Sequence, residues 1–151
     1  MRLRARKLAI LFLFAGVLTS FPTTSFAVTT YSFTTAGSTG NLGPTQDSVT
    51  AAYSATNLAG SVTIISRGIQ QWIVPYTGTY QVTAIGSAGA NGNGTTAGKG
   101  ASMQGTFSFT AGDTLRIVVG QMGVAGTLYV SGGGGGSFVF YNDTDTTPLL
   151  V

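Results

Sequence analysis

The chain has 151 residues, enough for one domain, and it is rich in glycine, with 23 copies. It carries four acidic and seven basic residues and contains no histidine, cysteine or glutamate. This composition excludes Ser-His-Asp and Cys-His catalysis, zinc sites built from histidine and cysteine, and disulfide bonds. We therefore expect a non-catalytic protein that uses no cofactor and is held together by its core and its hydrogen bonds.

The N-terminal segment, residues 1–27, has the three parts of a secretory signal peptide. It begins with a basic stretch made of Arg2, Arg4, Arg6 and Lys7. The apolar stretch 8–18 is short for a bilayer span, and the small residues Ser25 and Ala27 favour cleavage after Ala27. We therefore predict a mature chain of residues 28–151 that is secreted or displayed at the cell surface. An uncleaved membrane anchor is the less favoured alternative.

Removal of this segment would also remove most of the basic residues. The mature chain keeps Arg67, Lys99 and Arg116 against four aspartates, a net charge of −1. So few charges leave no basic patch for nucleic acid or for an anionic membrane surface. We expect neither nucleic acid among the partners nor a membrane span in the mature chain.

Short strands dominate the elements predicted for the mature chain. Alternating apolar residues and flanking turn residues predict strands over 28–35, 61–66, 68–75, 80–85, 102–110, 114–120, 128–130, 138–141 and 149–151. Residues 76–79 are typical of a turn, so 68–75 and 80–85 together predict a hairpin. In the first of these strands Trp72 lies on the face opposite Ile73. Strands this short and this closely spaced predict an all-β fold, an antiparallel β-sandwich or jelly roll.

Only one stretch of the mature chain has helical spacing. In 48–58, the residues Val49, Ala52 and Tyr53 fall where one or two helical turns would bring them together. Serine and threonine weaken this prediction because their hydroxyl groups compete for backbone hydrogen bonds.

The glycines recur at intervals of three residues. Three triplets have this spacing: Gly37, Gly40 and Gly43; Gly86, Gly89 and Gly92; and Gly120, Gly123 and Gly126. A run of five glycines, Gly132, Gly133, Gly134, Gly135 and Gly136, precedes the strand 138–141. A polyproline-II helix repeats every three residues, so we predict that the second and third triplets and the run are glycine-rich polyproline-II-like insertions packed on the sandwich. For the first triplet, glycines that serve as turn residues are an equal alternative.

The few residues that could support chemistry have simpler structural interpretations. Asp113 falls in the turn 111–113, and an acidic pair involving Asp47 is improbable with only four aspartates. Asp143 and Asp145 could offer oxygen ligands to calcium, but a polar turn is favoured because no third carboxylate is near in sequence. The five-glycine run resembles a phosphate-binding loop only in composition, since no helix N-terminus follows it.

Two aromatic residues could stack against a sugar ring. Trp72 alternates with strand residues, so we favour a place in the core for it. Tyr76 falls in a predicted turn, and it is the better candidate for an exposed ligand contact.

Several motifs resemble the extracellular glycine-rich domain of the anaplastic lymphoma kinase and leukocyte tyrosine kinase receptors, a pattern also found in bacterial secreted proteins. The motifs occur in the same order, and they are FTTAGSTGNLGPTQ (33–46), AYSATNL (52–58), GIQQWIVPYTGTYQV (68–82), IGSAGANG (85–92), VGQMG (119–123) and GGGGGSFVF (132–140). The resemblance implies a tumour-necrosis-factor-like β-sandwich with inserted polyglycine helices that binds a protein outside the cell. Ala36 stands where the receptors have a cysteine, and the kinase motifs are absent, so the receptors' kinase activity is not expected here. The ending TPLLV resembles the start of a further strand, which is typical of a domain that continues past Val151.

Three functions follow as hypotheses. The first is an exported, non-catalytic domain for extracellular binding or adhesion, whose partner is an extracellular protein. The second is a structural spacer or assembly module of a surface layer or fibre, in which glycine segments of different copies associate. The third is a carbohydrate-binding module that uses Tyr76.

Overall fold

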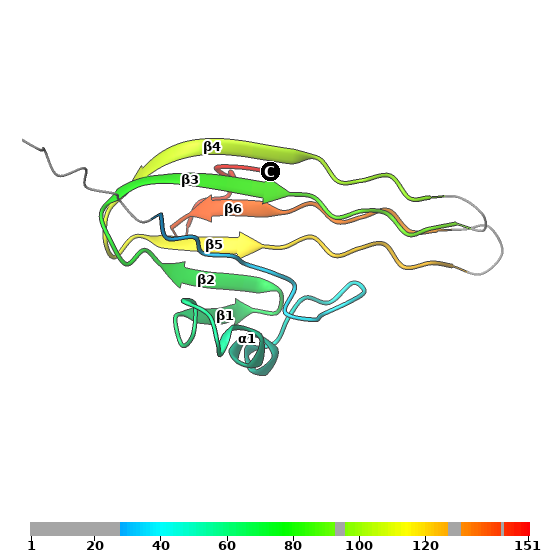
Figure 1. The fold of residues 1–151 in the computed structure, drawn as a ribbon, viewed down its shortest axis with the longest axis horizontal. Helices are drawn as coiled ribbons and strands as arrows, with labels where there is room; N and C mark the ends of the chain where they lie inside the picture. Colours follow the sequence, from blue (N-terminus) through cyan, green and yellow to red (C-terminus); the bar gives the residue numbers. More distant parts are fainter. Residues whose placement is uncertain (1–27, 93–95, 127–130, 143) are drawn as a thin grey trace, which may run out of the picture.

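The computed structural model describes residues 28–92, 96–126, 131–142 and 144–151. The elements are α1 (Gln46–Tyr53), β1 (Val62–Ser66), β2 (Ile69–Ile73), β3 (Gly78–Ile85), β4 (Ser102–Phe109), β5 (Thr114–Val118) and β6 (Phe138–Tyr141). All strand pairs are antiparallel, and they form a four-stranded sheet in the order β1-β2-β5-β6 and a two-stranded sheet of β3 and β4 (Figure 1). The prediction of an all-β, sandwich-like fold is confirmed.

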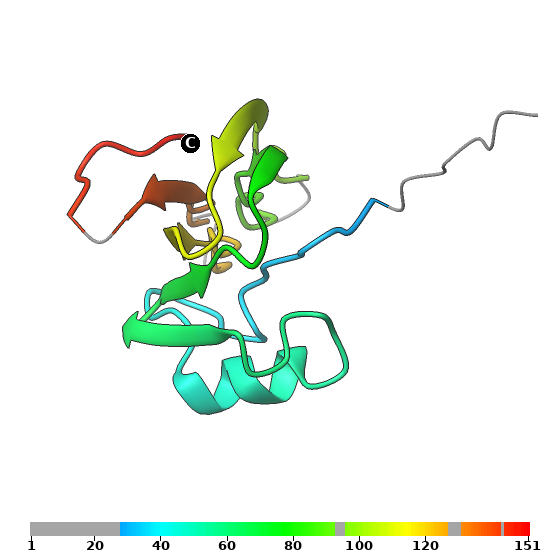
Figure 2. The same cartoon turned by 90° about the vertical axis from the view of Figure 1, so that its left-hand side faces the viewer.

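The core lies between the two sheets and follows from the alternation of residues along the strands. In β2 the side chain of Trp72 is buried, whereas that of the next residue, Ile73, is 58% exposed. The Trp72 ring packs 4.8 Å from the ring of Tyr31 and 6.4 Å from that of Tyr80 in β3, centroid to centroid. Trp72 therefore contacts both layers, and its predicted place in the core is confirmed. Figure 2 shows the two layers in a view turned by 90°.

The predicted hairpin between 68–75 and 80–85 is wrong, because β2 and β3 belong to different sheets. Beyond the end of β2, Val74 still forms two hydrogen bonds with the turn that precedes β5. Its N–H donates to the Asp113 carbonyl at 2.8 Å, and its carbonyl accepts from the Gly112 N–H at 2.9 Å. The next residue, Pro75, has no N–H to donate, so the ladder ends there and the chain crosses to the second layer. Alternation predicts which face of a strand is buried but not which strand lies beside it.

The predicted strand 28–35 is also wrong, because the segment pairs with neither sheet, and both edges of β2, on which it packs, are already paired. The segment runs extended, and side chains hold its backbone. The amide of Gln70 donates to the Thr34 carbonyl at 2.8 Å, and the Asn57 amide donates to the Thr30 carbonyl at 2.9 Å. The alternation of its aromatic residues reflects their packing on Trp72.

The two other predicted strands near the C-terminal end have different outcomes. Residues 149–151 form only an isolated antiparallel bridge, between Leu150 and Val139 of β6, so the predicted strand there is reduced to one pair. The predicted strand 128–130 lies outside the described residues.

The helix α1 forms earlier in the chain than the spacing of Val49 and Tyr53 suggested. Thr45 and Ser48 form a capping box, in which each side chain accepts from the other residue's backbone N–H, and this fixes the helix start. Just inside it, the Gln46 amide donates to the Val62 carbonyl at 3.1 Å and accepts from the Ile64 N–H at 2.7 Å. A glutamine side chain therefore pairs with the outer edge of β1 in place of another strand.

A buried polar network connects the helix, β2 and the N-terminal segment. The Tyr53 hydroxyl donates to the Gln70 Oε1 atom at 2.7 Å and accepts from the Thr34 N–H at 2.8 Å. Gln70 is completely buried, so its amide depends on these partners. The network fixes the N-terminal segment against the core without a strand ladder.

The substitution Tyr53→Phe is expected to destabilise the protein by about 1–3 kcal/mol, because it leaves the buried Gln70 Oε1 atom and the Thr34 N–H without their partner. Urea unfolding monitored by Trp72 fluorescence measures this change. The matched control Tyr76→Phe removes an exposed hydroxyl and should change stability by less than about 0.5 kcal/mol. Equal midpoints for wild type and Tyr53→Phe would contradict the role given to this network.

Candidate binding surface

Glycine-rich segments extend four of the strands beyond the sheets. Residues 86–92 continue β3, residues 96–101 lead into β4, residues 119–126 continue β5, and residues 131–137 lead into β6. We call these four segments the glycine bundle. They lie side by side as thin extended chains at one end of the molecule (Figure 1), so the bundle is a continuation of both layers.

The central segment, 86–92, bonds to its neighbours at every third residue. Its Gly86 and Gly89 N–H groups donate to the carbonyls of Ala101 and Gly98, at 2.8 and 3.1 Å. Donors and acceptors are each three residues apart. This interval is that of a polyproline-II helix, in which residues three apart lie on the same side.

The other two faces of segment 86–92 meet the remaining segments. The Ser87 and Ala90 N–H groups donate to the carbonyls of Gly135 and Gly132, both at 2.9 Å. The carbonyl of Ala88 accepts from Gly123 at 3.1 Å. Each set of every third residue therefore faces a different neighbour, as a threefold helix at the centre of a bundle requires.

Segments 119–126 and 131–137 also bond to each other at this interval. The N–H groups of Gly132 and Gly135 donate to the carbonyls of Val124 and Gln121, at 3.0 and 2.9 Å. Although all five glycines of the run are exposed, Gly132 and Gly135 each both donate and accept a backbone hydrogen bond. The run is therefore bonded on two sides.

The backbones approach so closely that several glycines of the bundle leave no room for a side chain. A Cβ atom added at Gly120 would overlap the carbonyl oxygen of Gly135, and one at Gly123 would overlap that of Gly132. A Cβ atom at Gly134 would overlap the Ser87 carbonyl. At Gly133, in contrast, an added Cβ atom would meet nothing within 4 Å.

Other glycines of the predicted set leave more room for an added Cβ atom or border residues that the structure does not describe. A Cβ atom at Gly86 or Gly89 would have ordinary contacts, the nearest at 3.6 and 3.4 Å, and one at Gly136 would lie 3.1 Å from the Phe138 ring. Gly92 and Gly126 each adjoin residues outside the described chain.

The first glycine triplet does not belong to the bundle. Gly37 and Gly40 have positive φ angles of 77° and 86°, so they are turn residues. Gly43 packs directly on Gly68, where an added Cβ atom would overlap the Gly68 Cα atom.

Ser137 connects the strands to the bundle, and sequence analysis did not single it out. Its hydroxyl donates to the Ile85 carbonyl at 2.7 Å and accepts from the Gly120 N–H at 2.9 Å. The direct bond from Gly123 to Ala88 joins residues 35 apart in the sequence, and Gly120 and Ile85 are also 35 apart. Gly120 and Ile85 therefore form the residue pair one helical turn earlier, and the Ser137 hydroxyl links them where no direct backbone hydrogen bond is made. Its signal in the sequence is a lone serine between the glycine run and an apolar strand.

A groove of 530 Å³ runs along one side of the bundle, lined by Gly133–Gly136, residues 118–124, and the loops around Gly40–Gly43 and Arg67–Ile69. We call it the bundle groove. Met122 and Val124 on its wall are 65% and 63% exposed. The Gln121 amide donates to the Leu42 carbonyl at 2.9 Å, and its Oε1 atom is buried without a partner among the described residues.

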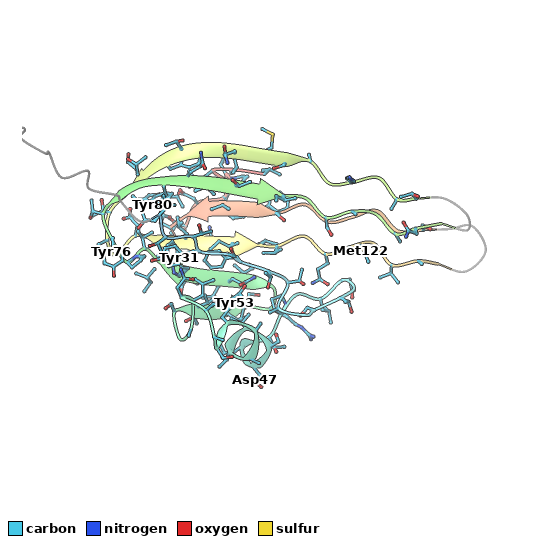
Figure 3. The ribbon with its side chains drawn as sticks, viewed as in Figure 1. Tyr31, Asp47, Tyr53, Tyr76, Tyr80 and Met122 are labelled. Carbon is cyan, nitrogen blue, oxygen red and sulfur yellow. The ribbon has the colours of Figure 1, made fainter. Side chains whose placement is uncertain are left out.

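Tyr76 lies at the sheet end of the molecule, far from Met122 on the bundle (Figure 3). Tyr76 is 71% exposed, and its carbonyl accepts from the Tyr80 hydroxyl at 2.7 Å. Trp72 is only 4% exposed, so it cannot join Tyr76 in a stacking platform for a sugar.

The aspartates that the structure describes have structural roles. Asp47 is exposed in the first turn of α1, where a negative charge favours the helix. The Asp113 carboxylate accepts from the Thr110 N–H at 2.8 Å, and its hydrogen bond with Tyr141 raises the pKa of that hydroxyl group. The predicted turn at Asp113 is confirmed.

The turn considered for calcium is formed by other contacts. The Asn142 side chain accepts from the Thr144 N–H at 3.0 Å, and the Arg116 guanidinium donates to the carbonyls of Asn142 and Asp145. Asp143 lies outside the described residues. In the described part of the chain, no three histidine, cysteine, aspartate or glutamate side chains lie together as metal ligands. No helix among the described residues has the length and apolar character that crossing a membrane requires.

Comparison with known proteins gives a distant similarity. No protein-family model matches the sequence. The chain is 35% identical over 95 residues to the leukocyte tyrosine kinase receptor of Mus musculus. The match covers 60% of this chain but 11% of the receptor, so the chain corresponds to a small part of that protein.

The neighbouring substitutions Gly134→Ala and Gly133→Ala are expected to have opposite effects on stability. Gly134→Ala places a Cβ atom on the Ser87 carbonyl and should destabilise the protein by about 1–3 kcal/mol, as overpacking does. Gly133→Ala meets open space and should be neutral or stabilising by up to about 1 kcal/mol, since alanine restricts the unfolded chain.

Urea unfolding measures both effects, and amide hydrogen exchange at Ser87 and Ala90 shows whether the bundle opens. Exchange at these amides should accelerate in Gly134→Ala alone. Equal destabilisation by both substitutions would mean that close backbone contact does not determine the glycine pattern.

Proposed function

We propose that this chain is an exported, non-catalytic domain that binds an extracellular protein through the bundle groove. Residues 1–27 would direct export, and residues 28–151 would act outside the cell. The distant similarity to a receptor supports a role in binding. The observation that carries the proposal is the exposure of Met122 and Val124 beside a backbone platform.

The groove contains two residue types that are enriched at protein interfaces. Methionine and arginine are enriched at such interfaces, and here Met122 lies in the same groove as Arg67. Leu42, whose side chain is 50% exposed, is joined to the groove wall through the bond from Gln121. Close backbone bonding keeps the platform rigid, so little entropy is lost on binding.

Assembly of identical copies is the second candidate function. The glycine run supports it, because an added Cβ atom at Gly133 meets nothing, so one side of the run remains open to another chain. The carbohydrate alternative has less support: Tyr76 is exposed, but its aromatic neighbour in the sequence, Trp72, is in the core.

Site-specific photocrosslinking in the native host tests the proposal. A benzophenone amino acid at Met122 should give a crosslinked product with another protein, at about fivefold the yield obtained at Met103, because core interface residues carry most of the contact. Met103 is the matched control, since it is a methionine 53% exposed on β4, away from the groove.

The mass of the product separates the candidate functions. A product of twice the chain mass would favour assembly over a separate partner. Equal yields at Met122 and Met103, or no product at Met122, would contradict binding at the groove. Loss of a glycan-array signal in Tyr76→Ala would favour the carbohydrate alternative.

A further inference from the structure

A large cavity lies between the two sheets, away from the bundle groove. Its volume is 620 Å³, and its lining includes the buried side chains of Trp72, Ala84, Phe109, Leu115, Ile117 and Val139. These residues come from strands of both layers. The cavity therefore extends between the two layers, and it opens to solvent beside the exposed residues Gln81 and Ile85.

Protein interiors seldom contain a void larger than a water molecule, and known ligand sites measure about 300–1,000 Å³. The volume here falls in the range of ligand sites. Water is a poor occupant, because it needs two or more polar partners and the inner lining is mainly apolar. The hydroxyl of Ser137, the buried polar side chain in the lining, already bonds to Ile85 and Gly120.

Among the residues that the structure describes, none with a charged side chain lines the cavity. Burial, and then the neighbouring Tyr80 and Tyr76, raise the pKa of Tyr31, so this wall residue is uncharged at neutral pH. The polar residues Thr30, Ser32 and Gln81 line the cavity and are exposed, which places them at its rim. The site thus combines an apolar interior with an uncharged polar rim.

The N-terminal segment, residues 30–35, forms one wall of the cavity. It belongs to neither sheet, and side-chain hydrogen bonds from Tyr53, Gln70 and Asn57 hold its backbone. The cavity opens beside the exposed residues Thr30, Ser32 and Gln81. A ligand can therefore enter next to this segment and leave both sheets intact.

We infer that this cavity binds an uncharged amphiphile with a single alkyl chain, the chain between the sheets and the polar end among the hydroxyl and amide groups of the rim. This site is separate from the bundle groove and does not depend on the proposed protein partner. The lack of charged residues selects against fatty acids and alkylammonium ions, whose charge would be buried without a partner.

Trp72 is the only tryptophan of the chain and lines the cavity, so its fluorescence reports occupancy directly. Bromododecanol, an uncharged alkyl chain with a quenching bromine, should quench Trp72 in the purified secreted protein and be displaced by dodecanol. Bromopropanol at the same concentration should quench little, because its short chain buries too little apolar surface to occupy the cavity. Dodecanoate should displace the probe at least about tenfold less effectively than dodecanol, which corresponds to about 1.4 kcal/mol.

The substitution Ala84→Phe fills the cavity from β3 and should raise the probe concentration for half-quenching by at least about tenfold without lowering the unfolding temperature. Ala52→Phe adds the same ring to an exposed position of α1 and should bind as the wild type does. If Ala84→Phe fails to fold, Ala84→Leu, with a smaller side chain, gives the same comparison. Absence of quenching in the wild type, or unchanged quenching in the folded cavity variant, would overturn the inference.

Discussion

Direct contact between backbones, with no side chains between them, is the constraint on which the rest of this structure depends. At Gly120, Gly123 and Gly134 a Cβ atom would overlap a carbonyl oxygen of the adjacent segment. Only glycine permits the chains to approach to hydrogen-bonding distance on several sides at once. Because β3, β4, β5 and β6 all lead into these contacts, the bundle fixes how the two sheets are placed relative to each other.

The two halves of the molecule are stabilised by different interactions. At the sheet end, apolar burial dominates, and the aromatic cluster around Trp72 joins the N-terminal segment, β2 and β3. At the bundle end, regularly spaced backbone hydrogen bonds replace side-chain packing. A two-stranded sheet such as β3–β4 is marginal in water by itself. Here it is supported from both ends, by Tyr80 packed on Trp72 and by segment 86–92 at the centre of the bundle.

Sequence patterns predicted which residues are buried better than they predicted which strands lie side by side. Alternation placed Trp72 inside and Ile73 outside, because the side-chain period of a strand is a property of one chain. It could not show that β2 pairs with β5, since many registers would bury Trp72 equally well. The three-residue interval of the glycines pointed to a threefold helix, but their partners depend on the sheets. Ser137, Gln70 and Met122 were missed because a serine, a glutamine and a methionine have no periodic signal.

The hydroxyl of Ser137 lies at the junction between the strands, which repeat every two residues, and the glycine bundle, which repeats every three. Strands present the same face every two residues and the bundle every three, so the chain must change phase at this junction. Adding three residues to one arm would insert a complete turn, so each later residue would keep its face but lie one turn further along its neighbours. Adding one residue would rotate all later positions by about 120° and direct side chains into neighbouring backbones. The projecting end of this molecule can therefore lengthen only in whole turns, of about 9 Å each, with both arms of a hairpin changing together.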